Sequence, residues 1–333
     1  MAKKKLKLAQ VGGGMFGHEV VFRCLMDIER FGLVPYLDSA GLDHHAADLL
    51  DVEFEVVAIG DPKTADQLVN EYKEVIPTSR IRPFYSFAPW DEIIAECKPD
   101  VLFVATPDHL HTPAILAALE AGVHVVSEKP LTLKLDEADE IIRRAREGNL
   151  VVACDMHKRY DAFLRSAFVD VVPRLGKLNY ARAVLEEPLE ISTEVFKWAA
   201  QSNPFSYVGC HWTDLFTHYL GVEPVSLHAV GQKHLLKDWK NESNPDGIDT
   251  FDSMQVAVEY DNGMRVDYVN AWINPKDFEG PVNQEMDIIG ARLRETGTGL
   301  RRAVPGSSAR PAHRFRRPWR WWPPDGPSPP ARC

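Results

Sequence analysis

The chain has few cysteines, no closely spaced cysteine pair and no long apolar run. Its five cysteines are Cys24, Cys97, Cys154, Cys210 and Cys333. An odd, scattered set without C-x-x-C excludes a disulfide framework and a cysteine zinc site, and it predicts a reducing compartment. No segment approaches the ~18 apolar residues of a membrane span. Lys7 and Gln10 interrupt any signal-peptide core. We therefore expect a cytoplasmic protein with no membrane partner.

Lysine is absent from the end of the chain. Residues 291–333 hold ten arginines, eight prolines and only two acidic residues, a net charge of +8. Residues 1–290 hold 28 basic and 46 acidic residues, a net charge of −18. Because the end shows no helical or strand periodicity, we expect 291–333 to be a disordered basic tail. For the folded body we expect no nucleic-acid partner.

A glycine-rich turn follows the first apolar segment, residues 6–11. Its spacing fits G-x-G-x-x-G, and a helix over 18–30 follows. Such a strand-turn-helix lets a dinucleotide pyrophosphate approach bare backbone at a helix N-terminus. The candidate cofactor residues of this turn are Gly12, Gly14, Met15, Phe16 and Gly17.

An acidic residue at the end of the second strand would hold the adenosine ribose. Asp61 follows the apolar strand 52–59, but it lies 49 residues after Gly12 rather than the usual ~20. This distance requires an insertion over 27–51. Asp38 is better spaced, yet Pro35 argues against a central strand before it. We favour Asp61.

Apolar strands then alternate with amphipathic helices up to residue 155. Helices are predicted at 65–75, 89–97, 112–121 and 135–147, and strands at 81–87, 101–105, 123–127 and 150–155. This alternation predicts an α/β domain over 1–155 with a doubly wound parallel sheet. The strands' carboxyl ends, where ligands bind such sheets, carry Thr106 to His111, Ser127 to Pro130 and His157 to Tyr160.

The regular alternation of strands and helices ends at residue 155 and does not continue over residues 156–290. Helices are predicted at 162–172 and 208–220, and strands at 178–185, 225–235, 251–260, 264–273 and 285–289. Asp261-Asn262-Gly263 between two of these strands is a strong hairpin signal. We expect an α+β domain with a largely antiparallel sheet, which binds substrate and forms the oligomer interface.

Four motifs in order resemble one known family. They are the glycine turn, Thr106-Pro107 with His111, Glu128-Lys129-Pro130, and Gly209-Cys210-His211-Trp212-Thr213-Asp214 closed by Leu220-Gly221. Together they resemble the Gfo/Idh/MocA family of NAD(P)-dependent oxidoreductases, from about Leu6 to Gly290. The resemblance implies an N-terminal Rossmann domain and hydride transfer between a nicotinamide cofactor and a hydroxyl or carbonyl of a sugar, cyclitol or related polyol.

The resemblance also implies residue roles. Lys129 would contact the nicotinamide ribose and the substrate and stabilise a developing alkoxide, and His211 would serve in acid/base catalysis. Tyr207 replaces an aspartate of many members, so we assign it only an auxiliary catalytic and substrate role. Further cofactor contacts fall on Thr106, Pro107, His111 and Glu128.

Several residues have two interpretations. Arg159 either binds substrate or pairs with an acid of the protein. His211, Asp214 and His218 share a helix face, but no cysteine or glutamate completes a metal site, so we expect no metal. The three tryptophans that suit sugar stacking are more often core residues. They are Trp198, Trp212 and Trp272.

The cofactor and assembly predictions stay open in part. Lys63 would suit a 2′-phosphate, whereas the Asp61 carboxylate repels one, so NAD is favoured and NADP remains possible. A homo-oligomer is expected by analogy. From a different functional class, a non-catalytic dinucleotide sensor of the same fold would keep the cofactor site and lack turnover.

Three accounts explain the tail. Its interleaved Arg and Trp residues could bind an anionic partner, it could be an ordinary extension, or the reading frame slipped near Gly290. We favour the slipped frame, which truncates the second sheet, because arginine replaces lysine abruptly there. The coding DNA tests this account: a single-base shift should restore a strand-forming continuation.

Overall fold

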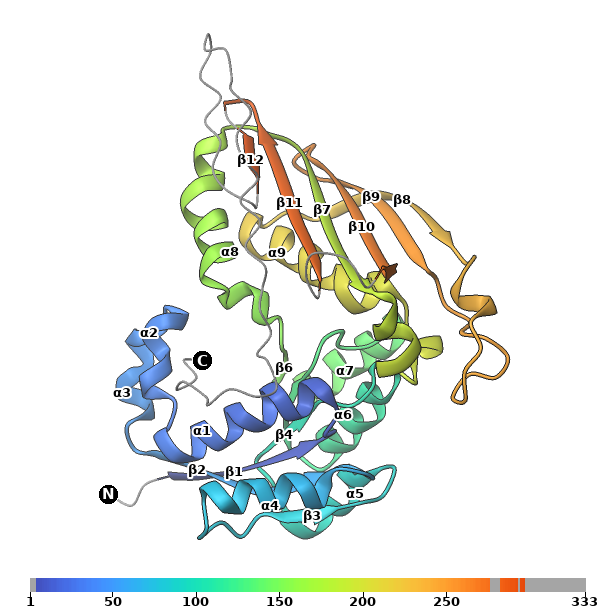
Figure 1. Cartoon of the computed structure of the whole chain (residues 1–333). Helices are drawn as coiled ribbons and strands as arrows, with labels where there is room; N and C mark the ends of the chain where they lie inside the picture. The colour runs from blue at the N-terminus through green and yellow to red at the C-terminus, as the bar shows by residue number, and fades with distance from the viewer. Residues whose placement is uncertain (1–3, 276–281, 293, 297–333) are drawn as a thin grey trace. The chain divides into compact units, whose positions relative to one another are not determined.

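The computed structural model describes residues 4–275, 282–292 and 294–296 (Figure 1), and the chain divides into two units between Asp155 and Met156. Each unit has its own sheet and its own hydrophobic core. The domain roles predicted from the sequence remain proposals. Among the described residues, no helix combines the length and apolar character needed to cross a membrane.

The first unit contains a six-stranded parallel sheet in the order β3-β2-β1-β4-β5-β6. Its strands are β1 (Lys4–Val11), β2 (Val52–Gly60), β3 (Arg82–Phe84), β4 (Val101–Val104), β5 (His124–Ser127) and β6 (Val152–Cys154). This is the strand order of a doubly wound dinucleotide-binding sheet. The predicted α/β fold is confirmed.

Helices cover both faces of this sheet (Figure 1). They are α1 (Arg23–Phe31), α4 (Ala65–Val75), α5 (Pro89–Cys97), α6 (His111–Glu120) and α7 (Leu135–Glu147). Leu8 and Val56 belong to the core with α1 and α4, whereas Ala9 and Ala58 belong to the core with α5, α6 and α7. Leu8 and Ala9, which are neighbours on β1, thus serve opposite faces, as a doubly covered sheet requires. On β2 the change of face falls at the register shift that pairs Leu8 with Val56 and Ala9 with Ala58.

The stretch between α1 and β2 contains no strand. Val34–Tyr36 is a 3₁₀ turn that includes Pro35, and two short helices follow, α2 (Leu37–Ala40) and α3 (Ala46–Leu49). Asp38 therefore lies in a helix, and Asp61 directly follows β2. Of the predicted insertion 27–51, residues 27–31 belong to α1, and the stretch from 32 to 51 carries the short helices.

The second unit contains a mixed six-stranded sheet in the order β12-β11-β7-β10-β9-β8. Its strands are β7 (Leu178–Pro188), β8 (Pro224–Gln232), β9 (Ser253–Tyr260), β10 (Arg265–Asn274), β11 (Asn283–Gly290) and β12 (Arg294–Thr296). Among the described strands of this sheet, only β7 and β10 pair in parallel, so the predicted largely antiparallel α+β sheet is confirmed.

The described part of this unit contains the α-helices α8 (Ala162–Ser166) and α9 (Cys210–Leu220). A π-helical turn at Ala167–Val171 follows α8, and another at Phe205–Gly209 precedes α9. Trp212, Leu215 and Phe216 of α9 are buried in one core with Tyr268 of β10. Gly209 lies close to the sheet, since a Cβ there would be 2.6 Å from Asn270 Oδ1.

The predicted end of the sheet at Gly290 is wrong. β12 pairs antiparallel with β11, with Ile288 opposite Glu295. The backbone N–H groups of Ala291 and Arg292 also donate to carbonyl oxygens of Lys177 and Leu175. The composition of 291–333 indicates no strand, but β12 and the residues just before it form hydrogen bonds with β11 and with the segment before β7. The remaining tail predictions concern residues 297–333, which lie outside the described residues.

Candidate active site

The glycine turn joins β1 to the π-helical turn Gly17–Phe22 that leads into α1. Gly12 has φ +92°, and a Cβ there would lie 2.2 Å from the Ala105 carbonyl oxygen. A Cβ at Gly17 would lie 2.5 Å from the Gly12 carbonyl oxygen, whereas one at Gly14 meets nothing within 4 Å. Gly12 and Gly17 are thus required by the fold, and Gly14 leaves exposed backbone at the position where a pyrophosphate is expected to approach.

Asp61 lies against this turn. Its Oδ2 accepts a hydrogen bond of 2.8 Å from the Gly13 N–H, and its Oδ1 accepts from the Lys63 and Thr64 N–H groups at 2.8 and 2.9 Å. Three backbone donors fix the carboxylate, and Oδ2 retains acceptor capacity for a ribose hydroxyl. The structure thus places Asp61 beside the glycine turn, while its cofactor role remains a prediction.

The residues between Gly14 and Gly17 differ in exposure. Met15 is 40% exposed, and Phe16 is partly buried at the start of the π-helical turn. Both are adjacent to the predicted pyrophosphate position, and their cofactor contacts remain predictions.

His111 connects the loops after β4 and β5. Its ring nitrogens lie 2.7 Å from the Pro130 carbonyl oxygen and 2.9 Å from the Thr106 carbonyl oxygen. Burial lowers the pKa of His111, and a neutral imidazole has one N–H to donate to one of the two oxygens. His111 therefore fastens these loops, which include Thr106, Pro107 and the Glu-Lys-Pro turn, rather than presenting its ring to solvent.

Glu128 and Lys129 directly follow β5, and both are buried, with 8% and 7% exposure. Burial raises the pKa of Glu128 to about 9, and the charge of Asp155 and a side-chain hydrogen bond to it add to the rise. The Lys129 charge acts in the opposite direction. Burial and the neighbouring Asp155 thus both favour the protonated form of Glu128.

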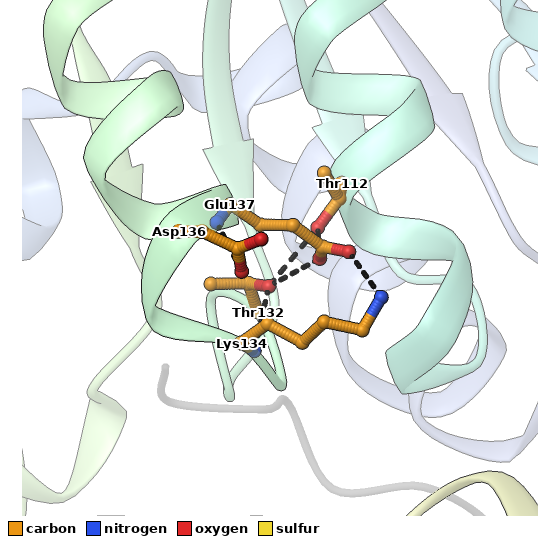
Figure 2. Close-up of polar contacts among 5 residues, drawn as sticks. All are labelled: Thr112, Thr132, Lys134, Asp136 and Glu137. Carbon is orange, nitrogen blue, oxygen red and sulfur yellow. Dashed lines mark hydrogen bonds and ion pairs between the residues drawn. The ribbon is translucent and has the colours of Figure 1, made fainter.

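A network of side chains anchors the turn that follows Lys129. Figure 2 shows Glu137 of α7 accepting hydrogen bonds from Thr112 of α6 and from Thr132, at 2.6 and 2.7 Å, and from the Lys134 ammonium at 2.9 Å. These hydrogen bonds, that of Thr112 first, lower the pKa of Glu137 to about 2. The network ties α6, α7 and the turn together, and it was not predicted from the sequence.

In the second unit, Arg159 forms an ion pair with Asp214. Its Nε donates to Asp214 Oδ2 at 2.8 Å, and its Nη2 donates to Oδ1. The Tyr219 hydroxyl donates to the Arg159 carbonyl oxygen at 2.5 Å. The ion-pair interpretation of Arg159 is therefore what the structure shows, and a substrate contact remains a prediction. Asp214 thus pairs with the guanidinium of Arg159, and the expectation that it binds no metal with His211 and His218 stays a prediction.

Tyr207 lies in an aromatic cluster. Its ring centroid is 4.8 Å from that of Phe196 and 5.8 Å from those of Trp198 and Trp272. Trp272 is fully buried, and its indole N–H donates to Glu187 Oε2 at 2.8 Å. The core interpretation of Trp272 is thus confirmed.

His211 lies in the first turn of α9 and is 6% exposed. Its ring meets that of His157 edge-on, with centroids 4.8 Å apart. The neighbouring Trp212 is 2% exposed and donates its indole N–H to the Val184 carbonyl oxygen at 3.0 Å, so it too is a core residue. The predicted roles of His211 and Tyr207 are not tested by these contacts.

The fold and the glycine turn define a dinucleotide-binding α/β protein with a second, mixed-sheet unit. Residues 30–156 match the description "Oxidoreductase family, NAD-binding Rossmann fold", and residues 173–293 match "GFO/IDH/MocA C-terminal domain". The chain belongs to the Gfo/Idh/MocA family.

Curated relatives match over part of their length. D-glucoside 3-dehydrogenase of Escherichia coli K12 is 29% identical over 194 residues, which are 52% of this chain and 53% of that protein. UDP-N-acetylglucosamine 3-dehydrogenase of Acidithiobacillus ferrooxidans is 32% identical over 169 residues, 50% of this chain and 49% of that protein. The chain thus spans about half the length of these relatives.

Solved structures share the fold. Myo-inositol 2-dehydrogenase of Lactobacillus plantarum has a TM-score of 0.67 at 19% identity, covering 88% of this chain and 76% of that one. Scyllo-inositol dehydrogenase of Lactobacillus casei, with bound NAD(H) and scyllo-inositol, has a TM-score of 0.63 at 17% identity with the same coverage. At these identities the likeness concerns the fold alone.

Proposed function

We propose that the protein is an NAD-dependent oxidoreductase that transfers a hydride between the cofactor and a hydroxyl or carbonyl of a sugar, cyclitol or related polyol. The observation that carries this proposal is the carboxyl edge of the parallel sheet. The open Gly14, the fixed Asp61 carboxylate and the buried Lys129 follow β1, β2 and β5, which run in parallel. Ligands of such sheets bind at that edge.

The residues present fit NAD. Gly14 offers a close approach to backbone, and the negative charge of Asp61 favours ribose hydroxyls over a 2′-phosphate. NADP remains the alternative because Lys63 is nearby in sequence. Thr106, Pro107, His111 and Glu128 complete the proposed cofactor set.

When bound, the nicotinamide accepts the hydride of the alcohol carbon. We assign stabilisation of the developing alkoxide to the Lys129 ammonium and acceptance of the hydroxyl proton to His211, with Tyr207 as an auxiliary and Arg159 as a substrate contact. The carbonyl product, the reduced cofactor and one proton balance the reaction. A histidine suits the proton step because its ordinary pKa lies near neutrality.

The experiment is NADH formation across a panel of sugars and cyclitols. Lys129→Ala should lower kcat by about 10³-fold, because a charge-stabilising group in a buried site is lost. Lys73→Ala, which removes an exposed lysine of α4, is the matched control and should retain turnover. A kcat of Lys129→Ala equal to that of Lys73→Ala would refute the assignment.

A dinucleotide sensor is the second candidate. Tyr207 supports this candidate, because it stands where many family members have an aspartate and it packs against three aromatic rings. A phenol cannot hold an imidazolium as a carboxylate does. Saturable NADH binding without turnover on any polyol would support the sensor and contradict the enzyme.

We also propose a homo-oligomer in the cytoplasm. The edge strand β8 supports the assembly, because all nine of its residues are exposed, including Val225 and Leu227 at 64% and 68%. An exposed apolar edge of this kind is prone to pair with another chain. Sedimentation analysis of the full chain measures the oligomeric state.

A further inference from the structure

Asp155 is an acidic residue that directly follows a strand of the parallel sheet. Its N–H donates to the carbonyl oxygen of Ser127 at 2.8 Å, and Ser127 pairs with Cys154 where β5 and β6 end. Glu128 and Lys129 are the next residues after Ser127. The parallel register of β5 and β6 therefore places Glu128 and Asp155 next to each other at the carboxyl edge of the sheet.

The side chains of Glu128 and Asp155 are in contact. Oxygens of the two carboxyl groups lie within 4.8 Å of each other, and the groups share a hydrogen bond. Ionised carboxylates only accept hydrogen bonds, so one of the two must carry a proton. Because burial disfavours the ionised form of Glu128, that proton belongs to Glu128, which donates to the Asp155 carboxylate.

This arrangement balances charge around a buried cation. Lys129 is 7% exposed, and its charge and its backbone both act on Glu128. Two hydrogen-bonded carboxyl groups that share one proton carry a single negative charge, against the one positive charge of Lys129. Two ionised carboxylates would leave excess negative charge in a buried place.

We propose that Asp155 is a positioning residue of the predicted active centre: it accepts a hydrogen bond from protonated Glu128 and thereby fixes the turn that carries Lys129. This role rests on the proposed function, in which Lys129 stabilises the alkoxide. Asp155 is the anchor on the β6 side of that turn, as His111 is on the α6 side through Pro130. Unlike His111, which faces a backbone carbonyl oxygen, Asp155 acts on the side chain of Glu128.

The first test is infrared spectroscopy of the cofactor-free full chain across a pH series. The wild type should show a protonated-carboxyl band at neutral pH that Glu128→Gln removes. Asp155→Asn should move the pH midpoint of this band downward, because the neighbouring charge that disfavours ionisation is gone. Asp91→Asn, which removes an exposed charge on α5, is the matched control and should leave the midpoint in place. A missing band, or a midpoint unchanged in Asp155→Asn, overturns the proposal.

The second test is steady-state kinetics of the same variants. Asp155→Asn should lower kcat on the order of tenfold, as expected when a reacting group is slightly misplaced. Its unfolding midpoint should fall below that of Asp91→Asn, because buried Glu128 loses a hydrogen-bond partner. The two variants are therefore compared at a temperature at which both are fully folded, where the loss of kcat should persist and an unchanged kcat overturns the positioning role. If Asp155→Asn does not fold, Asp155→Glu, which keeps the carboxylate and displaces it, is measured instead, and an unchanged kcat in that variant overturns the role.

The two proposals fail separately. If the wild type turns over no polyol, the proposed function fails while the infrared titration still reports on the carboxyl pair. If the wild type is active and the band is absent, the enzyme assignment stands and the role of Asp155 is wrong.

Discussion

The two units hold their candidate residues in different ways. In the first unit, backbone groups position Asp61 and His111, whereas side chains anchor the turn after Lys129: three N–H groups fix Asp61, and two carbonyl oxygens face the ring of His111. In the second unit, side chains position the candidate residues: Arg159 pairs with Asp214, and Tyr207 packs among aromatic rings. Residues held by backbone groups at strand ends can be located from the order of strands along the chain. Residues held by side chains depend on tertiary packing, which no local sequence pattern predicts.

The largest stability effect should come from the backbone-built turn. Gly12→Ala places a Cβ 2.2 Å from the Ala105 carbonyl oxygen at φ +92°. The clash and the backbone strain together should cost about 3 kcal/mol or more of unfolding free energy. Gly122→Ala is the matched control: its φ of +75° brings strain alone, because no atom lies within 4 Å, and about 1 kcal/mol is expected. If urea denaturation gives the same loss of unfolding free energy for Gly12→Ala and Gly122→Ala, the close approach of the Ala105 carbonyl oxygen at Gly12 is contradicted.

The side-chain pair of the second unit should give a smaller effect. Asp214→Asn leaves the Arg159 guanidinium without its carboxylate, and the side chains are 11% and 34% exposed. Since Arg159 is partly solvated, we expect a loss of about 1 to 2 kcal/mol rather than the full value of a buried pair. Asp267→Asn, in an exposed pair with Arg265, should cost about 0.3 kcal/mol. If both variants lose the same stability, the Arg159 pair contributes no more than a surface pair.

Glu137 should give a comparable or smaller effect that depends on pH. Its folded pKa of about 2 lies below the ordinary value of 4.5, so its stabilisation is present above pH 4.5 and is lost as pH falls toward 2. Glu137→Gln should therefore cost about 1 kcal/mol near neutral pH and show less acid destabilisation than the wild type. Unfolding at neutral and acidic pH measures this difference.

The control for that measurement is Glu92→Gln, which removes an exposed charge of α5. Its acid destabilisation should equal that of the wild type. The account of the α6 and α7 network is wrong if Glu137→Gln behaves in the same way as this control.

The sequence predicted what periodicity and glycine geometry determine. The parallel sheet and the place of Asp61 directly after β2 are confirmed, because a proline disfavours a central strand and long apolar runs favour one. The end of the second sheet was wrong, because β12 depends on partners on β11 and not on its own composition.

The contacts of Asp155 and Glu137 were missed for a different reason. Glu137 and Thr112 are 25 residues apart and meet through helix packing, which no local pattern encodes. Asp155 had a usable signal, since it is an acid directly after a predicted strand, as Asp61 is. Only the register of β5 and β6 shows that Glu128 is its partner.

The most direct test of the central claim, that NAD binds at the glycine turn, is the NAD dissociation constant of Gly14→Ala, measured by calorimetry beside its unfolding free energy. A Cβ at position 14 meets nothing within 4 Å, so the account predicts unchanged stability. It predicts a dissociation constant raised about tenfold or more, because the methyl group occupies the approach of the pyrophosphate. Unchanged stability together with an unchanged dissociation constant would contradict the claim.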